Sequence, residues 1–183
     1  MNVVMIFADG FEDVEAIATR DVLIRAGISV VDVTINDSDT VTASHKIHLK
    51  GLKRLSEVNF DDFSAIILPG GSRGVDNLLK DDRVIELVKR FYTQDKYVCA
   101  ICAAPMVLGK AGLLKDKRFT CYPGCEEGID GIYTGEEVVV TSKIVTARSM
   151  LYSIPFGLKI VELLLSNDTS EKVFAGIAGL KKK

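Results

Sequence analysis

Short apolar runs rich in β-branched residues alternate with segments of helical spacing, and this alternation limits the folds open to the chain. The runs span residues 2–8, 29–35, 64–68 and 97–101. Near-continuous apolar runs of this length are typical of parallel strands buried on both faces. Strands and helices that alternate over short connections predict an α/β fold, a three-layer α/β/α sandwich with a mostly parallel central sheet.

The segments between these runs predict the other elements. The first helix is expected to bury one apolar face, formed by Val14, Ile17, Ala18, Val22 and Ala26, and to end at Gly27. Further helices are expected over 84–91, 103–112 and 154–165, with Pro105 in the first turn of the second. Residues 40–49 alternate weakly and predict a hairpin or an edge excursion, and residues 138–147 hold two more strand-like runs.

Size and charge exclude several classes of protein. The 183 residues, 48% of them hydrophobic, predict a single domain over 1–183 and exclude intrinsic disorder. A formal charge of −2 gives no general attraction for nucleic acid or anionic lipid, and the one basic run, Lys181–Lys183, is interpreted as a solvated end. Nothing resembles a signal peptide or the roughly 18 apolar residues of a membrane helix. We therefore expect a cytoplasmic protein without nucleic-acid or membrane partners.

Four cysteines then raise the question of metal binding. Cys99 and Cys102 are spaced like one ligand pair of a zinc site, and Cys121 and Cys125 like another. However, Cys99 lies inside an apolar strand, whereas paired zinc ligands need a tight turn between them. We expect no metal and no cofactor, and we interpret Cys99 as a small buried hydrophobe.

Cys102 stands where a strand is expected to turn sharply into a helix. Small residues flank it in the segment Ala100–Pro105, as a tight elbow requires. Such an elbow lifts its side chain above the sheet and often strains the backbone. A following helix N-terminus would lower the pKa of the thiol and make it nucleophilic. The alternative is a cysteine packed passively under the first helical turn.

Two other strand ends carry candidate partners for this thiol. In the acidic turn 9–15, Glu12 and Asp13 fit a helix N-cap cluster, but Glu15 fits it less well and is expected to meet Cys102 at the carboxyl edge of the sheet. A buried carboxylic acid there would be partly protonated. Gly70 and Gly71 follow another strand in a loop that matches no phosphate-binding motif. The N–H groups of Gly71 and Ala103 are expected to form an oxyanion hole.

Glu15, the Pro69–Gly71 loop and the Ala100–Pro105 elbow together resemble the DJ-1/ThiJ/PfpI superfamily, specifically its DJ-1 branch, over about residues 2–165. The resemblance implies a flavodoxin-like fold, a homodimer, Cys102 as the oxidisable nucleophile and Glu15 as its partner. It further implies that Gly70, Tyr122 and Pro123 line the pocket. His45 corresponds to an arginine that often reaches across the dimer, so it is either a contact to the partner's site or a surface histidine.

The chain also departs from its relatives. Protease branches place a histidine directly after the cysteine, where this chain has Ala103, so peptide hydrolysis lacks its general base. Tyr122-Pro123 stands where the best-known DJ-1 proteins have His-Pro. Ser149–Tyr152 replaces a Gly-Pro-Gly-Thr stretch and is expected to make the pocket wall bulkier.

Two functions use the same residues. The first is a glyoxalase or deglycase in which a Cys102 thiolate, assisted by Glu15, attacks an α-oxoaldehyde or its adduct. The second is a non-enzymatic sensor or chaperone in which peroxide oxidises Cys102. Turnover needs room for a small carbonyl compound, whereas oxidation needs almost none, so the bulk expected at 149–152 favours the sensor slightly. Cys121 and Cys125 are expected to flank the pocket and could form a reversible disulfide with Cys102.

Overall fold

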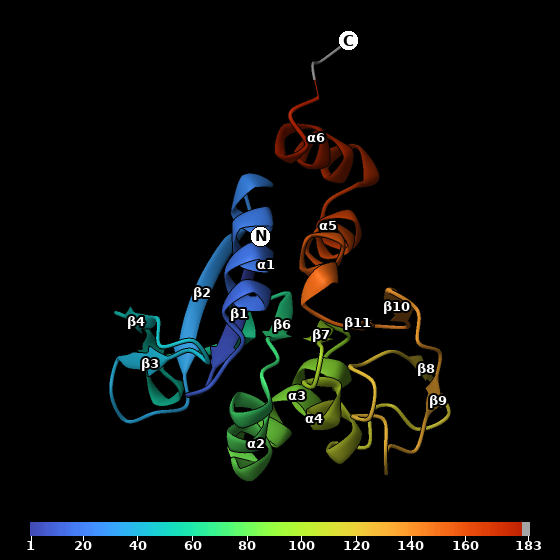
Figure 1. The fold of residues 1–183 in the computed structure, drawn as a ribbon. Helices are drawn as coiled ribbons and strands as arrows, with labels where there is room; N and C mark the ends of the chain where they lie inside the picture. Colours follow the sequence, from blue (N-terminus) through green and yellow to red (C-terminus); the bar gives the residue numbers. More distant parts are fainter. Residues whose placement is uncertain (181–183) are drawn as a thin grey trace.

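A seven-stranded sheet forms the centre of the computed structural model, which describes residues 1–180 (Figure 1). In spatial order the strands are Val138–Thr141 (β10), Ile144–Ala147 (β11), Tyr97–Ile101 (β7), Ala65–Leu68 (β6), Asn2–Phe7 (β1), Ser29–Thr34 (β2) and Lys53–Arg54 (β5). Within this sheet only the β10–β11 pair is antiparallel. The predicted mostly parallel sheet is therefore confirmed. The basic run 181–183 lies outside the described residues.

Helices cover both faces of the sheet (Figure 1). One layer contains Asp13–Arg25 (α1), Ser153–Leu164 (α5) and Asn167–Ile177 (α6), and the other Ser72–Lys80 (α2), Asp82–Thr93 (α3) and Pro105–Lys110 (α4). Alternate residues of β1 enter different cores: Val3 and Met5 pack on the first side, Val4 and Ile6 on the second. The strand is thus apolar on both faces because both faces are covered, and the three-layer sandwich is confirmed.

Smaller elements lie at the edges. The predicted hairpin is present as Thr40–Thr42 (β3) and His48–Lys50 (β4), which pair antiparallel. Arg118–Phe119 (β8) and Ile132–Tyr133 (β9) form a short parallel pair, and single 3-10 turns occur at Leu55–Glu57, Phe60–Asp62 and Met150–Tyr152. No helix in the described part of the chain combines the length and apolarity needed to cross a bilayer. The cytoplasmic location stays a prediction.

The expected buried face of α1 is right at Val22 and wrong at Val14 and Ile17. Val14 and Ile17 are 47% and 41% exposed, and the inward face carries Glu15, Ala16, Thr19, Val22 and Leu23. The helix packs closely on α5, where a Cβ added to Gly157 would lie 2.9 Å from the Val22 Cβ. The small side chains on the inner face of α1 allow α5 to come this close. The larger Val14 and Ile17 side chains lie on the outer face of α1.

Two helices were not predicted, and one is shorter than expected. α2 and α6 are additional to the expected helices. The helix expected over 103–112 starts at Pro105, which has no N–H to donate, and ends at Lys110. Gly112 then has a φ of +73°, a left-handed conformation that stops the helix.

Candidate active site

Cys102 occupies a strained elbow directly after β7. Its φ is +63°, a left-handed conformation that costs a non-glycine residue about 1–2 kcal/mol. Two backbone hydrogen bonds hold it there: the Cys102 N–H donates to the Ala147 carbonyl and the Tyr122 N–H donates to the Cys102 carbonyl, both at 2.8 Å. The surrounding sheet and loop thus fix the half-buried thiol in the conformation expected of an elbow.

Glu15 projects inward from the first turn of α1 and is 1% exposed. Its Oε2 accepts a hydrogen bond from the Gly70 N–H at 2.8 Å, whereas Oε1 is buried without a partner among the described residues. Burial is the main cause that raises the pKa of this carboxyl to about 7, against the opposing effects of its hydrogen bonds with Cys102 and Gly70. Near neutral pH the group therefore exists both as an acid and as a base.

The glycine loop fits tightly between Glu15 and Cys102. A Cβ on Gly70 would lie 2.5 Å from the Glu15 Oε2 and 2.8 Å from the Cys102 Cβ. Gly71 has a φ of +92°, and its added Cβ would lie 2.4 Å from the Gly10 carbonyl oxygen. Only hydrogen atoms fit at these two positions, which is why glycines stand there.

The sulfur of Cys102 interacts with one carboxyl and two N–H groups. Burial, then the negative charge of Glu15 and the hydrogen bond to it, raises the pKa of the thiol, while the N–H groups of Ala103 and Gly71 lower it. The expected net lowering is wrong, because the thiol is desolvated and α4 is only six residues long. The charge of Glu15 and the hydrogen bond to its carboxylate raise the pKa of Cys102 only while Glu15 is ionised. Cys102 and Glu15 therefore titrate as a coupled pair that shares one proton.

A cavity of about 620 Å³ opens in front of Cys102. Its walls come from the elbow, α2, α4 and the loop after β8, and its lining residues are Ser72, Val75, Asp76, Cys102, Ala103, Met106, Tyr122, Pro123, Gly124 and Cys125. Tyr122 and Pro123 line it as expected. Val75, Asp76 and Met106 were missed; a prediction of α2 would have brought the first two to this site.

Other expected contributors lie elsewhere. Ser149–Tyr152 does not line this cavity, and Leu151 is 75% exposed, so the expected bulkier wall is wrong and the sequence argument that favoured a sensor is removed. Gly70 lies behind the thiol rather than in the wall. His45 is also outside the cavity; its Nδ1 lies 2.8 Å from the Asp13 Oδ2, and its side chain is largely exposed.

Potential metal ligands gather away from the thiols. Within residues 1–180, one group of three such side chains has its ligand atoms within 4.8 Å of one another, namely Glu12, Asp13 and His45. The four cysteines form no such group and no disulfide. Cys99 is fully buried in β7, as expected of a small hydrophobe.

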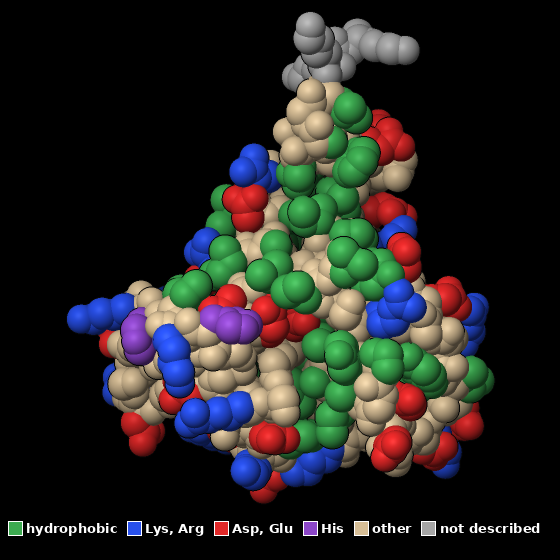
Figure 2. Space-filling view, viewed as in Figure 1, with side chains coloured by type: hydrophobic (Ala, Val, Ile, Leu, Met, Phe, Trp, Pro, Cys, Tyr) green, Lys and Arg blue, Asp and Glu red, His purple; other side chains and the backbone are tan. Residues whose placement is uncertain are grey.

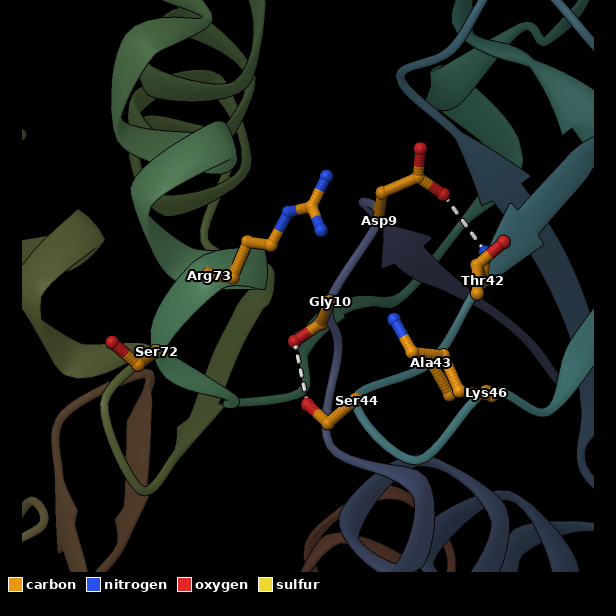
Figure 3. A pocket seen from close by; sticks show the side chains of 8 residues that line it. All are labelled: Asp9, Gly10, Thr42, Ala43, Ser44, Lys46, Ser72 and Arg73. Carbon is orange, nitrogen blue, oxygen red and sulfur yellow. Dashed lines mark hydrogen bonds between the residues drawn. The ribbon is translucent and has the colours of Figure 1, made fainter.

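A second cavity of about 410 Å³ shares Ser72 with the first (Figure 3). Arg73 and Lys46 bring positive charge to it from α2 and from the β3–β4 loop. The Asp9 carboxylate accepts a hydrogen bond from the Thr42 N–H at 2.8 Å, and the Ser44 hydroxyl donates to the Gly10 carbonyl at 2.9 Å. This cavity contains no cysteine and none of the predicted catalytic side chains.

Glu15 also makes a testable contribution to stability. The pKa of its carboxyl rises from 4.5 to about 7 on folding, so the folded state favours the protonated form. Its contribution is fully present below pH 4.5 and is lost as the pH rises through 7. Relative to Glu15→Gln, the wild type is expected to lose roughly 3 kcal/mol over this range. Urea unfolding of both proteins at several pH values measures the difference; parallel pH profiles would contradict a buried, titrating Glu15.

Comparisons with known proteins agree with the fold described above. The family model described as "DJ-1/PfpI family" matches residues 1–163. Protein dj-1beta of Drosophila melanogaster is 31% identical over 179 residues, 96% of each chain, and a deglycase of Pyrococcus abyssi is 33% identical over 153 residues, 81% of this chain and 90% of that protein. The solved structure of a cysteine-to-alanine mutant of a DJ-1 superfamily protein from Salmonella typhimurium superposes with a TM-score of 0.91, at 31% identity over 99% of each chain.

Proposed function

The chain belongs to the DJ-1/PfpI family, and we propose that it is a cysteine-dependent glyoxalase or deglycase that acts on α-oxoaldehydes or their adducts. The observation that carries this proposal is the Cys102–Glu15 pair, which faces two N–H donors beside a cavity of about 620 Å³. That volume has room for a three-carbon dicarbonyl compound. Relatives named deglycases support the same class of reaction.

The first step forms a bond between Cys102 and the substrate. The Glu15 carboxylate accepts the thiol proton while the sulfur adds to the aldehyde carbon. The resulting oxyanion is stabilised by the N–H groups of Gly71 and Ala103, the same groups that lower the pKa of the Cys102 thiol. Return of the proton from Glu15 gives a neutral hemithioacetal.

The second step isomerises and releases the product. Glu15 removes the proton from the former aldehyde carbon and returns it to the neighbouring carbonyl carbon, while the hydroxyl proton of the hemithioacetal passes to the neighbouring oxygen. The hemithioacetal thereby becomes a thioester of a 2-hydroxy acid. Water then cleaves the thioester and regenerates the thiol. Overall, one dicarbonyl compound and one water molecule are converted to one 2-hydroxy acid, and no external oxidant is needed. When the substrate is an adduct on an amine, the amine is released as well.

The charge of the cavity bears on the choice of substrate. Among residues 1–180, Asp76 is the one ionisable carboxyl that lines the cavity, and no Lys or Arg of this range lines it. A carboxylate there repels anionic substrates and attracts cations. We therefore expect uncharged oxoaldehydes, or adducts on amino and guanidino groups, to fit better than substrates that carry a carboxylate.

Lactate formation from methylglyoxal in D₂O tests the proposal. Turnover with proton transfer through Glu15 is expected to give lactate that carries deuterium at C2, because the abstracted proton exchanges with solvent. Absence of lactate above the uncatalysed rate would overturn the proposed function. Lactate without deuterium would instead overturn the proton transfer assigned to Glu15 and favour a hydride shift.

We also propose a homodimer, in which the outward face of α1 contacts a second copy. Exposed apolar side chains gather over the half of the molecule that carries α1, α5 and α6 (Figure 2). Val14, Ile17 and Ile24 on α1 are each more than 40% exposed. Ile17→Glu is expected to convert dimer to monomer in sedimentation experiments, because it places a charge in an apolar contact. A wild-type monomer at micromolar concentration would contradict the dimer.

A further inference from the structure

Two thiols open onto the same cavity. Cys102 lies on the elbow, and Cys125 lies on a tight turn closed by the hydrogen bond from its N–H to the Tyr122 carbonyl, 2.9 Å. The Tyr122 N–H in turn donates to the Cys102 carbonyl at 2.8 Å. The turn that carries Cys125 is thus attached directly to the backbone of Cys102, and both sulfurs border one space.

A third thiol lies behind this turn. Cys121 is fully buried, and its sulfur lies 3.9 Å from the Glu126 Oε2. Cys121 directly precedes the turn that the hydrogen bond from the Cys125 N–H to the Tyr122 carbonyl closes, and burial, followed by the Cys125 thiol, raises the pKa of Cys121 to about 12. An oxidant in solvent therefore has no direct access to Cys121.

The middle of the turn lies at the surface. Tyr122, Pro123 and Gly124 are exposed, and a Cβ added to Gly124 would contact nothing within 4 Å. Bridged cysteines need their Cα atoms about 4.4–6.8 Å apart. A disulfide with Cys102 therefore requires the exposed residues 122–124 to shift toward the cavity.

We propose that Cys125 resolves oxidised Cys102 and passes the disulfide on to Cys121. A peroxide ROOH first converts the Cys102 thiol to a sulfenic acid and leaves as ROH. The Cys125 thiol attacks that sulfur, which releases water and forms the Cys102–Cys125 disulfide. The Cys121 thiolate, its proton accepted by Glu126, then attacks Cys125 and expels Cys102 as a thiolate, which takes up a proton.

The net reaction oxidises two thiols to the Cys121–Cys125 disulfide, reduces one peroxide and returns Cys102 to its reduced form. Cys102 is thereby protected from irreversible oxidation to the sulfinic acid. The inference rests on the reactive Cys102 of the proposed function but does not require turnover of an oxoaldehyde. The disulfide relay is therefore tested independently of the lactate assay, whatever the result of that assay.

Intact mass and non-reduced peptide mapping after stepwise addition of hydrogen peroxide test the relay. The wild type is expected to lose two hydrogens and to show the Cys121–Cys125 disulfide, with little oxygen added at Cys102. Cys125→Ser is expected to accumulate sulfinic acid at Cys102 about tenfold faster, since no resolving thiol competes with the second oxidation. Cys121→Ser is expected to stop at the Cys102–Cys125 disulfide, which identifies the order of the two steps.

Controls separate the relay from a disturbed fold. Cys125→Ala checks that any effect belongs to the lost thiol rather than to serine, and thermal unfolding of each reduced variant checks that the turn is intact. A Cys121–Cys125 disulfide that forms equally fast in Cys102→Ser would overturn the relay, because Cys102 would not be the entry point. Equal rates of sulfinic acid formation in the wild type and both Cys125 variants would overturn it as well.

Discussion

Cys102→Ser is expected to lower oxoaldehyde turnover by at least about 10³-fold while changing the unfolding free energy by less than about 1 kcal/mol. The serine hydroxyl is nearly the size of the thiol, so the strained elbow and its two backbone hydrogen bonds are kept. An alcohol is a much weaker acid and a poorer nucleophile than a thiol, so Glu15, whose carboxyl has a pKa of about 7, activates a serine here far less well than a cysteine. Lactate release over time measures turnover, and urea unfolding measures stability.

Cys102→Ala is the matched control for the serine variant. It removes the hydroxyl as well, so both variants are expected to be equally inactive if the nucleophile is the sulfur. A serine variant that retained wild-type turnover would show that lactate arises without a covalent step at Cys102. Glu15→Gln is expected to lie between these variants and the wild type, since it keeps the thiol but removes the proton acceptor.

Gly71→Ala is expected to destabilise the protein by about 3 kcal/mol or more and to abolish turnover. Its φ of +92° disfavours any side chain, and the added Cβ would lie 2.4 Å from the Gly10 carbonyl oxygen and 2.6 Å from the Glu12 N. These are backbone atoms that a rotamer change cannot move. Relief of the clash must displace either the start of α1, which carries Glu15, or the N–H group that donates to Cys102.

Gly51→Ala provides the matched control. Gly51 has a similar φ of +86°, but an added Cβ would contact nothing within 4 Å. We expect it to cost only about 1 kcal/mol, the conformational part of the effect. The difference in urea unfolding between the two variants isolates the packing of Gly71 against Gly10 and Glu12. Equal losses of stability would show that the close fit of the loop has no energetic importance.

The strands of the central sheet were predictable because their environment is simple. Tyr97–Ile101 matches the structure to the residue, since a strand buried on both faces is an uninterrupted apolar run. The elbow and its partner Glu15 were also predicted, because parallel strands deliver the residues at their carboxyl ends to one edge. The apolar pattern therefore identifies the strands of the central sheet well, because helices cover both faces of these strands.

The missed features depend on contacts between segments far apart in the chain. α2 starts at a glycine with a left-handed φ and contains Gly74, a poor helix former whose added Cβ would lie 2.8 Å from the Phe11 backbone. Glycine at position 74 allows α2 to pack against the Phe11 backbone, but its low helix propensity argues against a helix at this position. Likewise the hydrogen bond from the Gly70 N–H to Glu15 was not predicted, because no apolar spacing reveals such a bond.

One turn of α1 carries Glu15 on its inner side and Val14 and Ile17 on its outer side. The carboxyl and the outer apolar surface are therefore parts of one rigid body, and a small rotation of the helix moves both. In the proposed homodimer the second copy packs on that outer surface, so a compound that loosens the subunit contact would reach the acid beside Cys102 without entering the cavity. Inhibitor screens that score only occupancy of the cavity would overlook this class of molecule.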